Sequence, residues 1–262
     1  MDWSKTKSIF IVTFLLLNIF LGFQLYSKMS GDNLAVMTET TLEDRLETNN
    51  IEMRFDDEDE NIEAGPITVS PRTFDERFLA QETERQDIEM LNEHTIYSLL
   101  EQPYQLVDAN LSASVDAFTQ QYIYEGEQYE IAEYNEEEDY IGLYQTHEGR
   151  KIDEYERENY HVVLHLNEDM QVQAYLQTMV NVSEQDRVQE LLSPIEVVER
   201  LFNQQHIRMN TVVEDAELRY YSLVEPDADF QVYAPVWRIE ADDEWFFVDA
   251  QQGELQTIQS ME

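Results

Sequence analysis

The longest uncharged apolar run in the chain lies near its amino terminus, between Ser8 and Ser27. Lys5 and Lys7 precede this run, and Lys28 follows it. An α-helix needs about 20 apolar residues to cross a bilayer, since each residue adds about 1.5 Å. The pattern therefore predicts a transmembrane helix over residues 8–27.

A secretory signal peptide is the alternative interpretation, because it also combines a basic start with an apolar stretch. Signal peptides have apolar regions of about 7–15 residues and end in small residues at the cleavage site. Here the run exits through Gly22-Phe23-Gln24-Leu25-Tyr26, which offers no such site. We expect an uncleaved, single-pass anchor in the cell membrane. The lysines hold the amino terminus in the cytoplasm, and the carboxyl-terminal domain is extracellular.

Beyond this segment the apolar spacing changes between helical and strand periods. Leu42 and Leu46 lie four residues apart behind a threonine cap, which predicts a helix over Thr41–Asn49. The following patterns indicate two strands and then a helical or mixed stretch, over Ile51–Phe55, Ile67–Val69 and Phe74–Ile88 respectively.

The middle of the chain, Thr95–Ile152, has a pattern rich in strands. Glu127–Tyr134 and Tyr140–Gln145 form a predicted hairpin with an acidic tip. Tyr160–Leu166 and Gln171–Val182 form a second one.

The carboxyl-terminal part begins with a helix signal, because Ser193 precedes Pro194 and stands three residues before Glu196. This helix is expected to end near Gln205. Gly253 occupies a turn position that needs a positive φ. Four strands are predicted after the helix: Val212–Val224, Phe230–Glu240, Trp245–Ala250 and Glu254–Ile258.

Together these elements predict an α+β fold, with antiparallel sheets and packed helices outside the membrane. The expected organisation has five parts: a cytoplasmic tail (1–7), the transmembrane helix (8–27), a connector (28–37), an extracellular α+β region (38–192), and a helix with a four-stranded sheet (193–262).

The charge of the chain narrows its possible partners. The formal net charge is −40, so nucleic acid and anionic lipid surfaces would be repelled. The hydrophobic fraction of 42% is large enough for a folded core. The sequence has no cysteine, so packing alone must stabilise an exported domain.

No enzyme motif with a recognisable mechanism is present, and we expect no catalytic, cofactor-binding or metal-binding residues. The acidic stretch Asp56–Glu63 is interpreted as a solvated connection, with a loose calcium site as the alternative. His161 and His165 lie four residues apart, which on a strand is about 13 Å, too far for one zinc ion without other ligands. We expect them to be ordinary sheet residues.

Aromatic residues of the last strands, Trp237, Trp245 and Phe247, allow two interpretations. Their spacing favours core packing over a binding platform.

Asn18 is the most informative polar residue, because an amide near the centre of a membrane helix is costly. Gly22, one turn later, allows another backbone to approach closely. A tolerated single asparagine is one interpretation, and a docking face for a partner helix is the other. The proposed partner-binding stripe consists of Ile11, Phe14, Leu15, Asn18, Gly22 and Leu25.

The first eleven residues, MDWSKTKSIFI, and the aliphatic helix with Asn18 resemble the start of the YycI (WalI) family. The later segments Pro235–Arg238 and Phe247–Glu254 agree with the layout of that family, and Phe247–Glu254 is also similar to the end of PepSY-type modules. The resemblance implies a membrane protein that acts with a sister protein, YycH, beside a sensor histidine kinase controlling cell-wall metabolism. It supplies no catalytic residues.

The leading hypothesis is therefore a non-enzymatic regulator whose helix packs in the bilayer. An extracellular binding module for a cation, a cell-wall fragment or a protease is the alternative. An anchored hydrolase is a third possibility, with no motif in its favour.

Overall fold

The computed structural model describes residues 41–55, 62–74, 85–153, 160–185, 187–222 and 231–260, together with residues 7, 13–15, 17, 18 and 20. The chain divides into two compact units, Met1–Asn49 and Asn50–Glu262, which are described separately. The described part is mostly β-sheet with a few helices, an α+β fold as predicted.

The first unit contains the helix α2, Leu42–Thr48. Thr41 is its N-cap: the threonine side chain accepts a hydrogen bond from the Asp44 amide, and the Asp44 carboxylate accepts one from the Thr41 amide. This reciprocal capping box satisfies amide groups that a short helix leaves unpaired. The predicted helix is confirmed.

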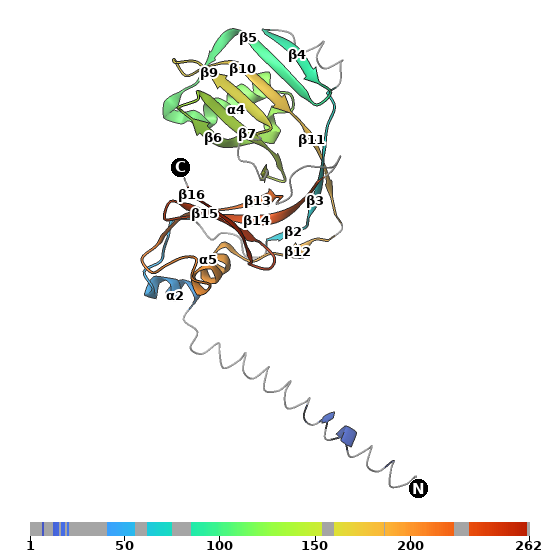
Figure 1. Cartoon of the computed structure of the whole chain (residues 1–262), viewed down its shortest axis with the longest axis vertical. Coiled ribbons are helices and arrows are strands. Elements are labelled where there is room, and N and C mark those ends of the chain that lie inside the picture. Colours follow the sequence, from blue (N-terminus) through green and yellow to red (C-terminus); the bar gives the residue numbers. More distant parts are fainter. Residues whose placement is uncertain are drawn as a thin grey trace. The chain divides into compact units, whose positions relative to one another are not determined.

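Among the described residues of the second unit, six strands form an antiparallel sheet, which we call sheet I. Its spatial order is β4, β5, β10, β9, β7 and β6 (Figure 1). The bounds are β4 Gln86–Asn92, β5 Thr95–Gln105, β6 Tyr129–Asn135, β7 Tyr140–His147, β9 Val162–Leu166 and β10 Gln171–Thr178.

One face of sheet I packs against the helix α4, Leu111–Tyr122, which lies between the 3-10 turns η1, Asp108–Asn110, and η2, Gly126–Gln128. Val115 and Phe118 of this helix are fully buried in the core of the sheet. Phe118 meets the ring of Tyr175 edge to face, at a centroid distance of 6.2 Å.

A second group of strands, sheet II, forms around β13 and β14. β14 pairs with β13 along one edge and with β3 and β15 along the other, while β1 and β16 extend the sheet further. The bounds are β1 Glu52–Met53, β3 Ile67–Pro71, β11 Val180–Glu184, β13 Val212–Tyr221, β14 Gln231–Ala241, β15 Glu244–Asp249 and β16 Leu255–Ser260.

The helix α5, Pro194–Asn203, precedes the last four strands of sheet II, β13 to β16, and buries Ile195, Val198 and Leu201. Ser193 and Glu196 form its capping box, as the sequence predicts. A separate two-stranded pair is formed by β2, Glu63–Ala64, and β12, Gln189–Glu190.

A short strand, β8 (Arg150–Asp153), joins the two sheets. β8 pairs antiparallel with β7 of sheet I and parallel with β13 of sheet II. A second connection runs from β10 directly into β11, which pairs with β3 beside β14 (Figure 1). Sheet I is thus built from one continuous part of the chain, and sheet II from parts on both sides of it.

The structure corrects two expectations for the middle of the chain. The strand-rich region Thr95–Ile152 also contains α4, a helix that was not predicted. Within Phe74–Ile88, residues 75–84 lie outside the described residues, and β4 begins at Gln86, so the end of that stretch is a strand. The first hairpin of the middle region and the four strands after α5 are confirmed where they are described. The second hairpin is confirmed as β9 with β10, but its predicted arm Gln171–Val182 is too long, because β10 ends at Thr178 and Val180 begins β11, which pairs with β3.

Candidate functional site at the junction of the two sheets

Six charged side chains gather where β8 meets β13, and we call them the ion cluster. They are Lys151, Asp153, Asp215, Glu217, Arg219 and Arg238. At its centre, Arg219 donates to Asp153 at 2.7 Å and to Glu217 at 2.6 Å. The Arg219 and Asp153 side chains are only 5% and 6% exposed, so this pair is removed from water. The cluster contains three positive and three negative groups, which balances its charge.

The pKa values within the ion cluster follow from burial and charge acting in opposite directions. Burial raises the pKa of Glu217, but the charges of Arg219 and Lys151 outweigh burial and leave this pKa below its ordinary value. Burial lowers the pKa of Arg238, and the neighbouring charge of Arg219 lowers it further. The Arg238 guanidinium lies 4.9 Å from the centre of the Trp245 ring, a cation–π contact. Each buried charge of the cluster therefore depends on its oppositely charged neighbours to offset the loss of hydration.

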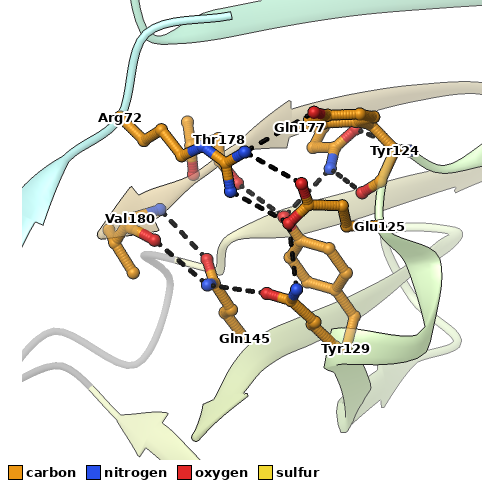
Figure 2. Close-up of polar contacts among 9 residues, drawn as sticks. Arg72, Tyr124, Glu125, Tyr129, Gln145, Gln177, Thr178 and Val180 are labelled. Atoms are coloured by element: carbon orange, nitrogen blue, oxygen red, sulfur yellow. Dashed lines mark hydrogen bonds and ion pairs between the residues drawn. The ribbon is translucent and has the colours of Figure 1, made fainter. Parts of the chain in front are cut away.

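Neutral side chains form a second connection, which we call the amide network (Figure 2). Gln145 of β7 accepts a hydrogen bond from the Val180 amide and donates to the Val180 carbonyl. Gln177 of β10 accepts one from the Tyr124 amide and donates to the Tyr124 carbonyl and to the Tyr129 hydroxyl. Both glutamines are buried, and each satisfies backbone groups as a neighbouring strand would.

Arg72 joins the amide network from the end of β3. Its guanidinium makes two hydrogen bonds to the Glu125 carboxylate, at 2.9 and 2.8 Å. This bidentate contact, more than any other, lowers the pKa of Glu125. The Glu125 carboxylate also accepts a hydrogen bond from Gln128. A residue that follows a strand of sheet II is thereby fixed to the segment between α4 and β6.

A pocket of about 640 Å³ lies beside the amide network. Three segments contribute most of its lining: the β4–β5 turn, the start of β9 and the connection from β10 to β11. The described lining residues are Pro71, Asn92, Glu93, His94, Thr95, Tyr160, His161, Thr178, Met179 and Val180.

The two histidines considered for metal binding have different surroundings. His161 is buried just before β9, and His165 is exposed on that strand. The two histidines differ because β9 begins after His161. The β7–β9 pairing ends at Leu143 and Val162, and beyond it the Gln145 amide donates to the His161 ring. Across the described residues, no three His, Cys, Asp or Glu side chains are placed to hold a metal ion. Residues 56–61 of the acidic stretch lie outside that description.

Only part of the proposed membrane stripe is described. Phe14 and Leu15 are exposed, and the Asn18 side chain donates to the Phe14 carbonyl one helical turn earlier, at 2.8 Å. Ile11, Gly22 and Leu25 lie outside the described residues, so the stripe stays a prediction. The described parts of the chain include no helix with the length and hydropathy needed to cross a bilayer.

The aromatic residues of the last strands are packing residues, as the sequence favours. Trp237 and Phe247 are buried, and the Trp237 indole donates to the Leu192 carbonyl at 2.9 Å. Phe247 stacks on Tyr221 at a centroid distance of 4.7 Å.

Sequence reasoning missed both the ion cluster and the amide network. Asp153 and Arg219 are 66 residues apart in the chain, and Gln145 and Val180 are 35 apart. One signal was available: Arg219 and Arg238 are basic residues at inward strand positions of an otherwise acidic chain. A buried arginine needs a buried carboxylate, so these two positions could have been marked.

Comparisons with known proteins give a family and several distant structures. No curated protein sequence matches the chain. A protein of unknown function from Eubacterium rectale is similar at 11% identity and a TM-score of 0.48, over 80% of this chain and 90% of its own. The YpeB C-terminal domain from Bacillus megaterium is similar at 10% identity and a TM-score of 0.39, over 75% of this chain and 90% of its own. YycH from Bacillus subtilis is similar at 12% identity and a TM-score of 0.36, over 76% of this chain and 52% of its own.

The family comparison covers most of the molecule. The model of the YycI protein family matches residues 30–251, which include α2, both sheets and the junction between them. The chain therefore belongs to the YycI family, a regulatory family of the YycFG two-component system.

Proposed function

We propose that this chain is a membrane-anchored, non-enzymatic regulator of the sensor histidine kinase of that system. The chain acts with a YycH-like partner, through transmembrane and extracellular contacts. The observation that carries the proposal is the family match over residues 30–251. The amino-terminal run with its flanking lysines supports the cell membrane as its location, with the second unit outside the cell.

Regulation requires that the protein bind one state of the kinase more tightly than the other. Within the bilayer, the Asn18 amide is the group best suited to distinguish two helix arrangements, because a polar group in hydrocarbon depends on its partner. Gly22 would allow a neighbouring helix to come close.

Outside the membrane, the junction supports a role as a stiff element. The Arg219–Asp153 pair of the ion cluster and the Gln145–Val180 hydrogen bonds of the amide network tie the two sheets together through buried contacts, which restrains movement of one sheet against the other. A partner that contacts either sheet would then act on the second unit as a whole.

The test replaces the two small or polar stripe residues together, as Asn18→Leu with Gly22→Leu, in the full chain in living cells. We expect kinase output, measured with a reporter of the response regulator, to change as it does when the protein is deleted. Thr13→Leu is the matched control, because it raises hydropathy on a different side of the predicted helix and should leave output unchanged.

Crosslinking at positions along 8–27 should capture the YycH-like partner or the kinase. An unchanged output in the double variant, combined with an altered output on deletion, would exclude helix docking.

A further inference from the structure

The face of sheet I opposite α4, which we call its outer face, can be mapped from the register of the strands. Ile96, Leu164 and Tyr175 lie in the core with α4, and successive side chains of a strand alternate between faces, so their chain neighbours lie on the outer face. Strand pairing aligns these neighbours in two rows across the sheet. The first row is Asp87, Leu99, Ala174, His165, Tyr140 and Asn135. The second row is Glu89, Tyr97, Leu176, Val163, Gly142 and Glu133.

The centre of the outer face is apolar, which is unusual for a free face of an antiparallel sheet. Such a face is commonly polar, because it meets water. Here Leu99 is 49% exposed, and Tyr97, Val163 and Leu176 are partly exposed on the neighbouring positions. The ring of Tyr160 lies against Gly142 and extends this surface over β7. A contiguous apolar surface of this kind indicates an interaction site.

The charge around this apolar centre is negative. The strands of sheet I contain no lysine or arginine. Asp87 and Glu89 lie at the β4 end of the rows, directly opposite Leu99 and Tyr97, and neither has an ion-pair partner among the described residues. At the β6 end, the Glu133 carboxylate accepts a hydrogen bond from the Tyr160 hydroxyl. The outer face therefore offers a partner apolar contact in the middle and carboxylates at both ends.

The dimensions of the outer face match those of a helix. Its six strands, spaced by about 4.8 Å, span about 24 Å, which is the length of about 16 helical residues. The two rows lie about 7 Å apart, and their side chains widen the band toward the diameter of a helix, about 10–12 Å. An added strand does not suit this surface, because strand addition uses a free edge of a sheet and not its face.

We propose that the outer face of sheet I binds an amphipathic helix of a partner protein, which carries lysine or arginine beside its apolar side. The basic residues would pair with Asp87 and Glu89, while the apolar side covers the centre of the two rows. A second copy of this chain is a poorer match, since its own outer face would add carboxylates to the contact. The proposal does not depend on the regulatory function.

The experiment uses the full chain in a nonionic detergent and relies on its lack of cysteine. Leu99→Cys places one thiol on the outer face. Ile258→Cys, on β16 of sheet II, is the control, because the exposed fractions of the two native side chains are similar, 49% and 45%. The probe is a helical peptide of leucine and lysine, about 18 residues long, with one activated disulfide. Trapping rates are divided by those of a small neutral disulfide, which corrects for thiol reactivity.

We expect the peptide to trap Leu99→Cys about tenfold faster than Ile258→Cys. A peptide with glutamate in place of lysine should remove this difference. Equal trapping of the two thiols overturns the proposal, and so does equal trapping of Leu99→Cys by the two peptides. Faster disulfide formation between two Leu99→Cys chains than between two Ile258→Cys chains would identify a second copy as the occupant and would also overturn it.

Two added substitutions separate the apolar from the charged contribution. In the Leu99→Cys chain, Leu176→Ser removes apolar area diagonally across from the thiol and should slow trapping about fivefold. Glu89→Gln removes one carboxylate at an exposed position, where folding does not depend on it, and should slow trapping about threefold. If Leu176→Ser does not fold, Glu89→Gln decides. Unchanged trapping in the folded variants overturns the proposal.

Discussion

The ion cluster and the amide network connect the same two sheets by opposite means. In the ion cluster, Arg219 and its two carboxylate partners are charged and buried, so each group depends on the others to offset the loss of hydration. In the amide network, the neutral Gln145 binds both backbone groups of Val180 across the junction, and the neutral Gln177 binds both backbone groups of Tyr124 on the side of sheet I. The difference teaches that a charged link is more sensitive to the loss of one member than a neutral link of similar burial.

The largest expected effect follows from removing the central charge with Arg219→Met. Asp153 and Glu217 would remain in the junction with their main partner gone. We expect the free energy of unfolding to fall by about 3–5 kcal/mol, measured by urea denaturation of the full chain with tryptophan fluorescence. Arg54→Met is the control, since its ion pair with Glu214 is about half exposed and should contribute far less. Equal losses in both variants would show that burial does not govern the cluster.

The second prediction concerns pH and His161, whose ring accepts a hydrogen bond from the Gln145 backbone amide beside the amide network. His161 has a pKa of about 4 in the folded chain, against about 6.5 when unfolded. As the pH falls, the unfolded chain therefore takes up the His161 proton before the folded chain does. The contribution of the neutral His161 ring to the free energy of unfolding is fully present above pH 6.5 and is lost as the pH falls toward 4. Relative to His161→Asn, the original chain should lose up to about 3 kcal/mol over this window. Denaturation curves at several pH values measure it. Parallel pH profiles for the two proteins would contradict the neutral, buried ring.

The smallest effect is expected in the amide network itself. Gln177→Ala leaves the Tyr124 backbone groups and the Tyr129 hydroxyl without this partner, which should cost about 2 kcal/mol. Gln173→Ala on the same strand is exposed and should change the free energy of unfolding by less than about 0.5 kcal/mol. Thermal and urea unfolding of the full chain would measure both. A loss larger than that of Arg219→Met would reverse the comparison.

Local signals in the sequence are sufficient to predict those helices and strands whose own residues mark where they begin and end. α2 and α5 were predicted because Thr41 and Ser193 form capping boxes with residues three positions later. The hairpins were predicted because polar turns separate alternating runs. α4 was missed because Asn110 makes no side-chain cap. Its apolar residues, including Leu111, Val115 and Phe118, nevertheless have helical spacing.

The candidate site could not be predicted in the same way, because its contacts depend on the path of the chain. The sequence contains 56 acidic residues, and nothing local distinguishes Asp153 or Glu217 from the exposed ones. The spacing of His161 and His165 gives no sign that the His161 ring is buried and accepts a hydrogen bond from the Gln145 amide, sixteen residues earlier. Contacts between residues far apart in the chain decide which polar residues become buried, and the pattern of residues along the sequence does not reveal those contacts.

The placement of sheet I between two parts of sheet II has a consequence for biogenesis. β1 and β3 are synthesised early, yet their partners β13 and β14 follow more than 140 residues later. Sheet I, by contrast, contains all of its strands in one uninterrupted stretch from Gln86 to Thr178. A growing chain can therefore complete sheet I before β13 and β14, the strands that pair with β1 and β3, have been synthesised. Closing the long loop to β13 and β14 is then the late, slow step of maturation.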